Sequence, residues 1–176
     1  MSKSDKNVNL SNPQKSDFEN LVKMNMKKAY YIALGFLGSH DLAMDASQEA
    51  FIKAYKNFNK FDKSKNFFTW YYKILKNHCL NIIRNIKNKK EDNYIEIKNI
   101  SENPLDNIEQ KEQIKLLEDA LEKLSFEKRE IIILKEFEEK SYLEITELLN
   151  IPLGSVMSRL FYARKELGKI LLKEMI

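Results

Sequence analysis

A lysine-rich stretch between positions 63 and 90 holds the residues best suited to nucleic-acid chemistry. It carries eight basic side chains and no acidic one, and aromatic residues are interleaved with these charges at positions 67–72. Rings that stack on bases, together with cations that contact phosphates, are the combination used to bind single-stranded nucleic acid. The pattern therefore indicates an anionic partner, while Trp70 and one or two of the other rings are expected to serve the hydrophobic core instead.

Three polar residues, Asp45, Gln48 and Glu49, form a second candidate site. Their spacing of three and four residues places them on one face of a helix. Such a set can act together on a single basic or polar helix of a partner, or it can simply solvate the helix that carries it. The residues alone leave both interpretations open.

The last third of the chain contains the most specific local pattern. Ser141 and Glu144 form a capping box, in which each side chain satisfies a free backbone amide at the start of a helix. That helix is followed by a turn at 150–152 and by a further helix over about 153–173. Two helices joined in this way predict a helix-turn-helix, whose second helix enters the DNA major groove. The alternative is an ordinary helical hairpin that packs on its neighbours.

The elements that position these residues are predicted to be helices throughout. Apolar residues recur at helical spacing over most of the chain. The additional predicted helices span about 18–38, 42–59, 68–87, 106–123 and 126–138. The last of these is expected to bury Ile131, Leu134 and Phe137.

Composition and length favour an all-α protein of two small helical domains joined by a flexible linker. The 176 residues include only 4 Gly and 3 Pro, and Val and Thr are scarce beside Leu, Ile, Lys and Glu. A polar, Asn- and Lys-rich segment without sustained periodicity begins near position 88. The predicted organisation is a disordered tail at 1–14, a first domain at 15–90, a linker at 91–105 and a second domain at 106–176.

Charge is distributed unevenly between the two halves. Residues 1–100 carry 18 Lys and Arg against 10 Asp and Glu, a net charge of +8, whereas residues 101–176 carry a net charge of −4. A basic first half agrees with a nucleic-acid partner. The competing explanation is a solvated surface in an organism whose codons favour Lys, Asn and Ile.

The single cysteine, Cys79, rules out an intramolecular disulfide. No apolar run approaches the roughly 18 residues of a membrane span, and the first seventeen residues lack the apolar core of a signal peptide. We therefore expect a cytoplasmic protein that does not insert into a membrane.

Four sequence motifs carry a resemblance to a known family. The first half contains Asp-Ala-Ser-Gln-Glu-Ala-Phe at 45–51 and Phe-Thr-Trp-Tyr-Tyr-Lys-Ile at 68–74. The second half contains Leu-Ser-Phe-Glu-Lys-Arg-Glu at 124–130 and Ile-Pro-Leu-Gly-Ser-Val-Met-Ser-Arg-Leu at 151–160. In this order and spacing they resemble regions two and four of the extracytoplasmic-function (ECF) sigma factors of RNA polymerase, here from a low-GC bacterium.

The resemblance implies two functions for the first domain. Asp45, Gln48 and Glu49 correspond to residues that dock on the clamp helices of core RNA polymerase. The same domain of the family reads the −10 promoter element as a melted strand, with the 62–67 loop as its specificity loop and Asn77 as a base contact. The residues expected to bind the single strand are Lys63, Lys65, Asn66, Phe67, Lys73, Lys76, Asn77 and Arg84.

The second domain is expected, by the same resemblance, to read the −35 element as duplex DNA. On the predicted recognition helix Val156, Leu160 and Ala163 point inward, and the other face is exposed. Met157 replaces the Lys or Arg frequent at that position of the family. The residues expected to bind the duplex are Ser155, Met157, Ser158, Arg159, Tyr162 and Arg164.

The predicted function is that of an alternative sigma factor, acting as a monomer. Its implied partners are core RNA polymerase, promoter DNA and an anti-sigma factor, which in this family is often membrane-tethered. The alternative is a helix-turn-helix repressor or activator, which would leave the set of Asp45, Gln48 and Glu49 unexplained. An enzyme fits worse, since His40 and His78 belong to no metal-ligand spacing and no nucleophile lies beside an evident base. We expect no catalytic residues, no metal site and no cofactor.

Overall fold

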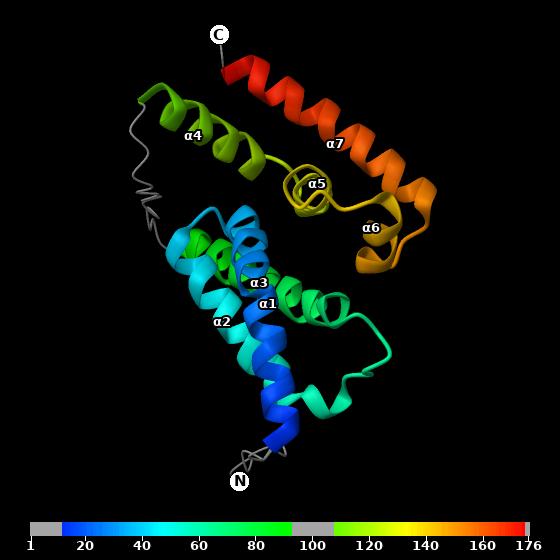
Figure 1. Cartoon of the computed structure of the whole chain (residues 1–176). Coiled ribbons are helices and arrows are strands. Elements are labelled where there is room, and N and C mark those ends of the chain that lie inside the picture. Colours follow the sequence, from blue (N-terminus) through cyan, green and yellow to red (C-terminus); the bar gives the residue numbers. More distant parts are fainter. Residues whose placement is uncertain (1–11, 93–107, 175–176) are drawn as a thin grey trace.

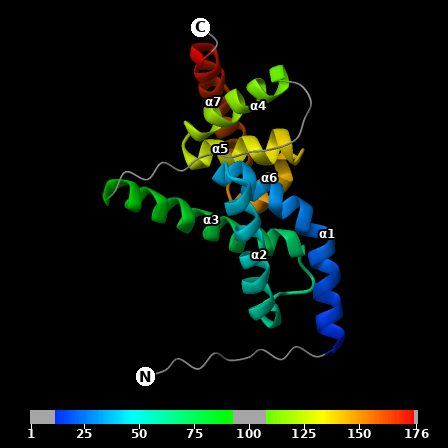
Figure 2. The ribbon, with the colours of Figure 1, turned by 90° about the vertical axis from the view of Figure 1, so that its left-hand side faces the viewer.

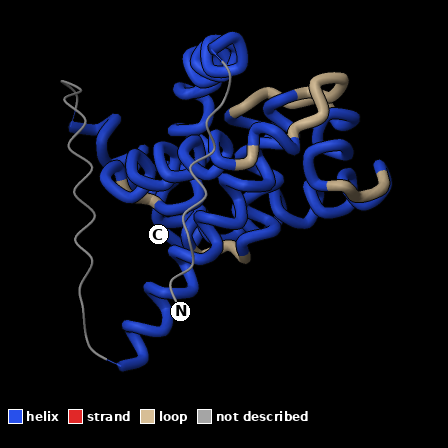
Figure 3. Tube along the Cα trace, turned by 90° about the horizontal axis from the view of Figure 1, so that it is seen from below, coloured by secondary structure: helices blue, strands red, loops and turns tan. Residues whose placement is uncertain are grey.

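The computed structural model describes residues 12–92 and 108–174, and every regular element in these two ranges is a helix (Figure 1, Figure 3). This confirms the predicted all-α class. The segment at 93–107, which includes most of the predicted linker, and the tail at 1–11 lie outside the described residues.

The first domain consists of three long helices packed on one another. Its elements are α1 (Asn12–Leu37), α2 (His40–Lys56), the short 3-10 helix η1 (Phe58–Lys60) and α3 (Phe67–Asp92). Gly38 adopts a positive φ of 64° between the first two helices, a conformation that favours glycine because it has no Cβ. Alanines on α2, at positions 43, 46, 50 and 54, are fully buried, so α2 lies close to α1 and α3.

The boundaries of this domain differ from the predicted ones at both ends. Helix α1 begins at Asn12, within the segment 1–14 that was expected to be a disordered tail. Helix α3 continues to Asp92, although the loss of apolar periodicity near position 88 had suggested the start of the linker. In Figure 2 this C-terminal part of α3 extends outward beyond the other helices. A helix that leaves the core no longer needs an apolar stripe.

The second domain contains the helix-turn-helix. Its elements are α4 (Ile108–Glu122), α5 (Phe126–Ile132), the π-helical turn η2 (Ile133–Phe137), α6 (Tyr142–Leu149) and α7 (Leu153–Glu174). The expectation that Phe137 is buried is wrong, because its side chain is 54% exposed. A π turn inserts an extra residue per turn, so the spacing that would have pointed Phe137 inward is shifted, while Leu134 remains fully buried.

The two domains touch each other. Helix α5 contacts α1, and α6 contacts α3, so that α5 and α6 lie between the first domain and the outer helices α4 and α7 (Figure 1). The ring of Phe126 on α5 lies 4.8 Å from that of Phe36 on α1, measured between centroids. The contact between Phe36 and Phe126 joins residues that are 90 apart in the sequence.

Candidate nucleic-acid interface

The acidic and amide side chains of α2 lie on the outside of the first domain. Asp45 and Gln48 are exposed and Glu49 is half-buried, whereas the alanine-rich face of the same helix packs in the core. One turn later, Lys53 donates a hydrogen bond of 2.7 Å to Nδ1 of His78 on α3. Burial, followed by the positive charge of Lys53, lowers the pKa of His78. The neutral imidazole therefore accepts from the lysine and ties α2 to α3 beside Glu49.

The loop before α3 has an internally ordered conformation. The carboxylate of Asp62 accepts hydrogen bonds from the Ser64 amide (3.0 Å) and hydroxyl (2.7 Å), and these bonds lower the pKa of Asp62. The side chain of Asn66 accepts from the Thr69 amide (3.2 Å) at the start of α3. Lys63 forms an exposed ion pair with Asp17 at 3.1 Å. Lys65 and Asn66 remain exposed.

The aromatic residues at the start of α3 serve the core rather than the surface. Phe67 and Phe68 are 6% and 8% exposed, and Tyr71 and Tyr72 are fully buried. Only Trp70 is half-exposed. The prediction that Phe67 offers its ring to DNA therefore needs correction. Its ring packs against several others, including those of Phe18 and Tyr71, and has no free face for a base. The reason is helical spacing, since residues four apart fall on the same buried face.

The polar residues of α3 form an exposed strip on the opposite side of the helix. Lys73, Asn77 and Arg84 are exposed, and their spacing of four and seven residues places them on one face. Lys76 lies next to this strip but is only 28% exposed, because its ammonium group lies 2.7 Å from a carboxylate oxygen of Glu130 in the second domain. Three of the predicted strand contacts thus share one surface of α3.

The helix-turn-helix has the geometry that the sequence predicted. The hydroxyl of Ser141 accepts from the Glu144 amide (3.2 Å), and the Glu144 carboxylate accepts from the Ser141 amide (2.8 Å), so the capping box is confirmed. Asn150 ends α6 with φ 54° and ψ 48°, a left-handed conformation that asparagine tolerates. Pro152 then precedes α7, where a proline is favoured because its missing N–H is not needed.

The buried and exposed faces of α7 also agree with the prediction. Val156, Leu160 and Ala163 are at most 1% exposed and pack against the domain core. The predicted duplex contacts lie on the exposed side, with Ser155 half-buried. The exposed residues are Met157 (54%), Ser158, Arg159, Tyr162 (60%) and Arg164.

Sequence reasoning missed Phe161 as a candidate contact. Its side chain is 62% exposed and meets Tyr162 edge to face, with centroids 5.4 Å apart. An exposed phenylalanine in the middle of the recognition helix is suited to an apolar contact such as a thymine methyl group. The signal was present in the sequence, since a helix that buries Leu160 and Ala163 must point Phe161 outward.

Arg164 is already engaged within the domain. Its Nε and Nη2 donate to the Glu136 carboxylate at 2.8 and 2.5 Å. The side chains of this pair are 50% and 42% exposed, so solvent screens the pair and the bond contributes little stability. Arg164 can exchange Glu136 for a phosphate at small cost.

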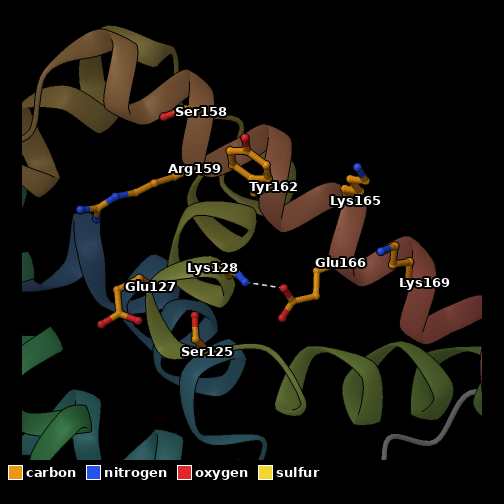
Figure 4. A pocket seen from close by; sticks show the side chains of 9 residues that line it. All are labelled: Ser125, Glu127, Lys128, Ser158, Arg159, Tyr162, Lys165, Glu166 and Lys169. Carbon is orange, nitrogen blue, oxygen red and sulfur yellow. Dashed lines mark hydrogen bonds and ion pairs between the residues drawn. The ribbon is translucent and has the colours of Figure 1, made fainter.

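An open groove of about 600 Å³ runs between the start of α5 and the outer face of α7. Figure 4 shows Arg159, Tyr162 and Lys165 following one another along α7 above this groove, with Lys128 of α5 turned toward Glu166. Lys128 and Glu166 form an ion pair. The groove is therefore lined by acidic and basic side chains, and all of the basic ones except Lys128 lie on α7.

Neither a metal centre nor a membrane-spanning element is found where the chain is described. Within residues 12–92 and 108–174, no group of three or more His, Cys, Asp or Glu side chains is arranged to hold a metal ion. None of the helices in these ranges combines the length and apolar character needed to cross a bilayer.

A helix-turn-helix domain beside a helical domain with a basic, polar strip is typical of DNA-binding proteins. Two family models match the chain, Sigma-70 region 2 at residues 21–89 and Sigma-70 region 4 at residues 114–167. The chain is 33% identical over 166 residues to the ECF RNA polymerase sigma factor SigW of Bacillus subtilis, covering 86% of this chain and 87% of the relative. It is 32% identical over 166 residues to the ECF RNA polymerase sigma-E factor of Escherichia coli, covering 86% of each.

Solved structures show the same arrangement of helices. The sigma factor RpoE of Bartonella quintana, in complex with the anti-sigma factor NepR, matches with a TM-score of 0.69 and 25% identity, over 89% of this chain and 97% of that chain. CnrH, in complex with the cytosolic domain of CnrY, matches in fold with a TM-score of 0.68. The chain belongs to the ECF sigma factor family, and its two domains are regions two and four.

Proposed function

We propose that this sigma factor divides promoter recognition between α3 and α7 and binds core RNA polymerase through α2. The observation that carries the proposal is the presence of two exposed polar surfaces of different chemistry in separate domains. The strip on α3 combines cations with an amide and suits a single strand. The outer face of α7 belongs to a helix-turn-helix and suits a major groove.

Asp45, Gln48 and Glu49 are proposed to contact the polymerase. They lie on the outer face of α2, and they carry two carboxylates for the basic side chains of a partner helix. The opposite face of α2 is packed in the core, so a helix that docks on these residues need not disturb the fold.

The −10 strand is proposed to follow the exposed strip of α3 and the loop before it. This assignment retains Lys63, Lys65, Asn66, Lys73, Lys76, Asn77 and Arg84 and leaves out Phe67, which is buried. Trp70 is the ring of this region that keeps a partly exposed face and is the better candidate for stacking on a base.

The −35 element is proposed to lie against Ser155, Met157, Ser158, Arg159, Phe161, Tyr162 and Arg164. Arg159 is the best candidate for a specific contact, because it is exposed and no ion pair holds it among the described residues. Arginine contacts guanine or phosphate in such helices.

An anti-sigma factor is the proposed regulatory partner. The support is the likeness to RpoE of Bartonella quintana, which was solved in complex with the anti-sigma factor NepR. Such a protein would have to cover the polar surfaces of α2, α3 or α7 to keep the sigma factor from polymerase and promoter. The surface of α2 contains carboxylates and that of α3 contains cations. The partner is therefore expected to carry basic side chains opposite α2 and acidic side chains opposite α3.

The test is a gel shift at controlled salt combined with permanganate footprinting, with and without core polymerase. The promoter is taken from transcripts sequenced after induced expression. We expect weak binding to duplex DNA by the protein alone, since residues 151–176 carry five basic side chains against two glutamates and few phosphate contacts are available. Specific binding and reactive thymines at −10 are expected only when core enzyme is added.

The repressor alternative predicts the opposite behaviour. Tight, sequence-specific duplex binding by the protein alone, with no strand opening after core enzyme is added, would refute the proposed function.

A further inference from the structure

A lysine of α2 is bonded to α3 and not to its neighbour on its own helix. Glu49 and Lys53 are four residues apart, with the glutamate on the N-terminal side, which is the order that best favours an ion pair on a helix surface. Among the described residues, no ion pair joins these two side chains. The less favourable order occurs in region four, where Lys140 and Glu144 do pair at 2.7 Å. Something other than spacing therefore keeps Lys53 from Glu49.

The partner that Lys53 has instead is the imidazole of His78. Nζ of Lys53 lies 2.7 Å from Nδ1 of His78. Because an ammonium group has only donors, Nδ1 must accept and the imidazole must be neutral. Burial, followed by the charge of Lys53, lowers the pKa of His78 and favours this neutral form, although the carboxylate of Glu49 acts in the opposite direction. Lys53 therefore has two acceptors within its reach, one on α3 and one on α2.

The bond to His78 is placed to prevail over an ion pair with Glu49. Lys53 and His78 are both half-buried, in the region where α2 packs against α3. An ion pair with Glu49 would instead form on the outer surface of α2, where solvent screens it. The packing of the two helices thus keeps the ammonium group away from the outer face.

The choice of acceptor decides the charge of the proposed docking surface. Asp45 and Glu49 are one turn apart on α2, and neither forms an ion pair within the part of the chain that the structure describes. A basic partner helix would therefore meet two uncompensated carboxylates. If Lys53 turned to Glu49, the partner would have to break that pair before it could bind. Complementary charge across an interface sets both the rate of encounter and the register of docking.

We propose that His78 is a positioning residue for polymerase docking, which holds Lys53 on α3 and thereby keeps the carboxylate of Glu49 free for the partner. This inference rests on the proposed docking of core polymerase on α2. His78 acts without touching the polymerase. Its removal should therefore weaken docking only while Lys53 is present.

The first test compares two replacements of His78 in the full chain. His78→Leu removes the acceptor. His78→Asn is the matched control, because its amide oxygen can take the place of Nδ1 and because asparagine and histidine have similar helix propensities. Binding to tagged core polymerase is measured by biolayer interferometry without DNA, so that the neighbouring Asn77, which is assigned to the −10 strand, does not contribute.

We expect His78→Leu to weaken binding about two- to fivefold, the equilibrium factor of an exposed ion pair that must first be broken. His78→Asn should bind like the native chain. Native affinity in His78→Leu would overturn the inference, and so would a loss in His78→Asn as large as that in His78→Leu.

The second test asks whether Lys53 carries the effect. In His78→Leu/Lys53→Met no ammonium group remains to pair with Glu49, so binding should return at least to the native level. Structural damage at position 78 would persist in this double variant. A double variant as weak as His78→Leu would therefore refute the role of His78. A loss of binding in Lys53→Met alone would also refute it, since Lys53 would then serve the polymerase directly.

Glu49→Gln separates failure of this inference from failure of the proposed docking. It should weaken binding by itself, and His78→Leu should add nothing in its presence, because Lys53 no longer has a carboxylate to neutralise. Native affinity in Glu49→Gln would contradict docking through Glu49, and the inference would fall with it. If Glu49→Gln weakened binding and His78→Leu weakened it further by its full factor, the docking assignment would stand and the role of His78 alone would be wrong.

Discussion

Arg129 of α5 donates one hydrogen bond of 2.8 Å to the carbonyl oxygen of Phe36 in region two and another of 2.8 Å to the carbonyl oxygen of Glu122 in region four. One guanidinium group thus satisfies the C-terminal carbonyls of helix α1 and of helix α4 together. Carbonyls at these positions have no partner within their own helices. A planar group with several donors is needed to serve both.

Replacing Arg129 should therefore cost more stability than replacing its neighbour. We expect Arg129→Met to lower the free energy of unfolding by about 1–3 kcal/mol, because two partly buried carbonyls lose a charged donor. Arg129→Lys should recover only part of this loss, because one ammonium group cannot reach both oxygens. Urea unfolding of the full chain, followed by circular dichroism, measures these differences.

Lys128→Met is the matched control for Arg129. Its ion pair with Glu166 is about one-third exposed, and pairs of this kind contribute at most about 1 kcal/mol. A loss for Lys128→Met as large as that for Arg129→Met would contradict the bridging role of Arg129.

The polymerase surface predicts a loss of binding without a loss of folding. We expect Asp45→Lys/Glu49→Lys to abolish co-purification with core polymerase, because both carboxylates that would face the partner helix reverse their charge. The melting temperature should change little, since exposed substitutions usually alter stability by about 0.5 kcal/mol or less. Pull-down with tagged core enzyme and thermal unfolding measure the two quantities.

Glu19→Lys on the exposed side of α1 is a control for the added positive charge. It should leave polymerase binding unchanged. Undiminished binding by the double variant would show that α2 is not the docking helix.

The sequence predicted the all-α fold and the helix-turn-helix but not the contact between the domains. Helical periodicity and the capping box at Ser141 and Glu144 depend on residues close together in the chain, and both were predicted correctly. Glu130 and Lys76 are 54 residues apart. Nothing in the local pattern around Glu130 distinguishes it from the exposed glutamates nearby, so its burial against Tyr72 and Lys76 of α3 follows only from the tertiary structure.

Two errors have local physical causes. Phe137 is exposed because the π turn at 133–137 breaks the regular spacing on which the prediction depended. Phe67 was assigned to DNA because aromatic residues alternate with lysines in its segment. The same residue type fills the core of a small helical domain, and only the four-residue spacing to Tyr71 indicates which role prevails.

The capping box makes the stability of region four sensitive to acid. Hydrogen bonds from Lys140 and from Ser141 lower the pKa of Glu144 from 4.5 to about 2. Because the folded-state pKa is depressed, its contribution is complete above pH 4.5 and is lost as the pH falls toward 2. We expect Glu144→Gln to flatten this part of the stability profile. Urea midpoints measured between pH 6 and pH 2.5 test this expectation.

Ser141→Ala probes the other half of the box. Loss of an N-cap hydroxyl costs about 1 kcal/mol, and the amide of Glu144 would lose its acceptor. Ser64→Ala in region two, whose hydroxyl donates to Asp62 outside any helix, is the control for removing an exposed hydroxyl. If both alanine variants lost the same small amount, the box would have no special role in starting α6.

The proposed division of promoter recognition between α3 and α7 can be tested by replacing one residue on each helix. We expect Arg159→Ala to weaken use of promoters that depend on the −35 element, by about 1–3 kcal/mol if the contact is bidentate to guanine. Asn77→Ala should instead change base preference or strand opening at −10. Arg164→Ala is the comparison within α7, since Arg164 is held by Glu136, and a phosphate contact would weaken all sequences alike.

The measurement is transcription in vitro from a library in which each position of both promoter elements is varied. Arg159→Ala should relax preference only within the −35 element, and Asn77→Ala only within the −10 element. Arg164→Ala should lower output without changing preference. If Arg159→Ala and Asn77→Ala altered preference at the same promoter position, α3 and α7 would not read separate elements, because a duplex contact and a strand contact in different domains cannot meet one base pair.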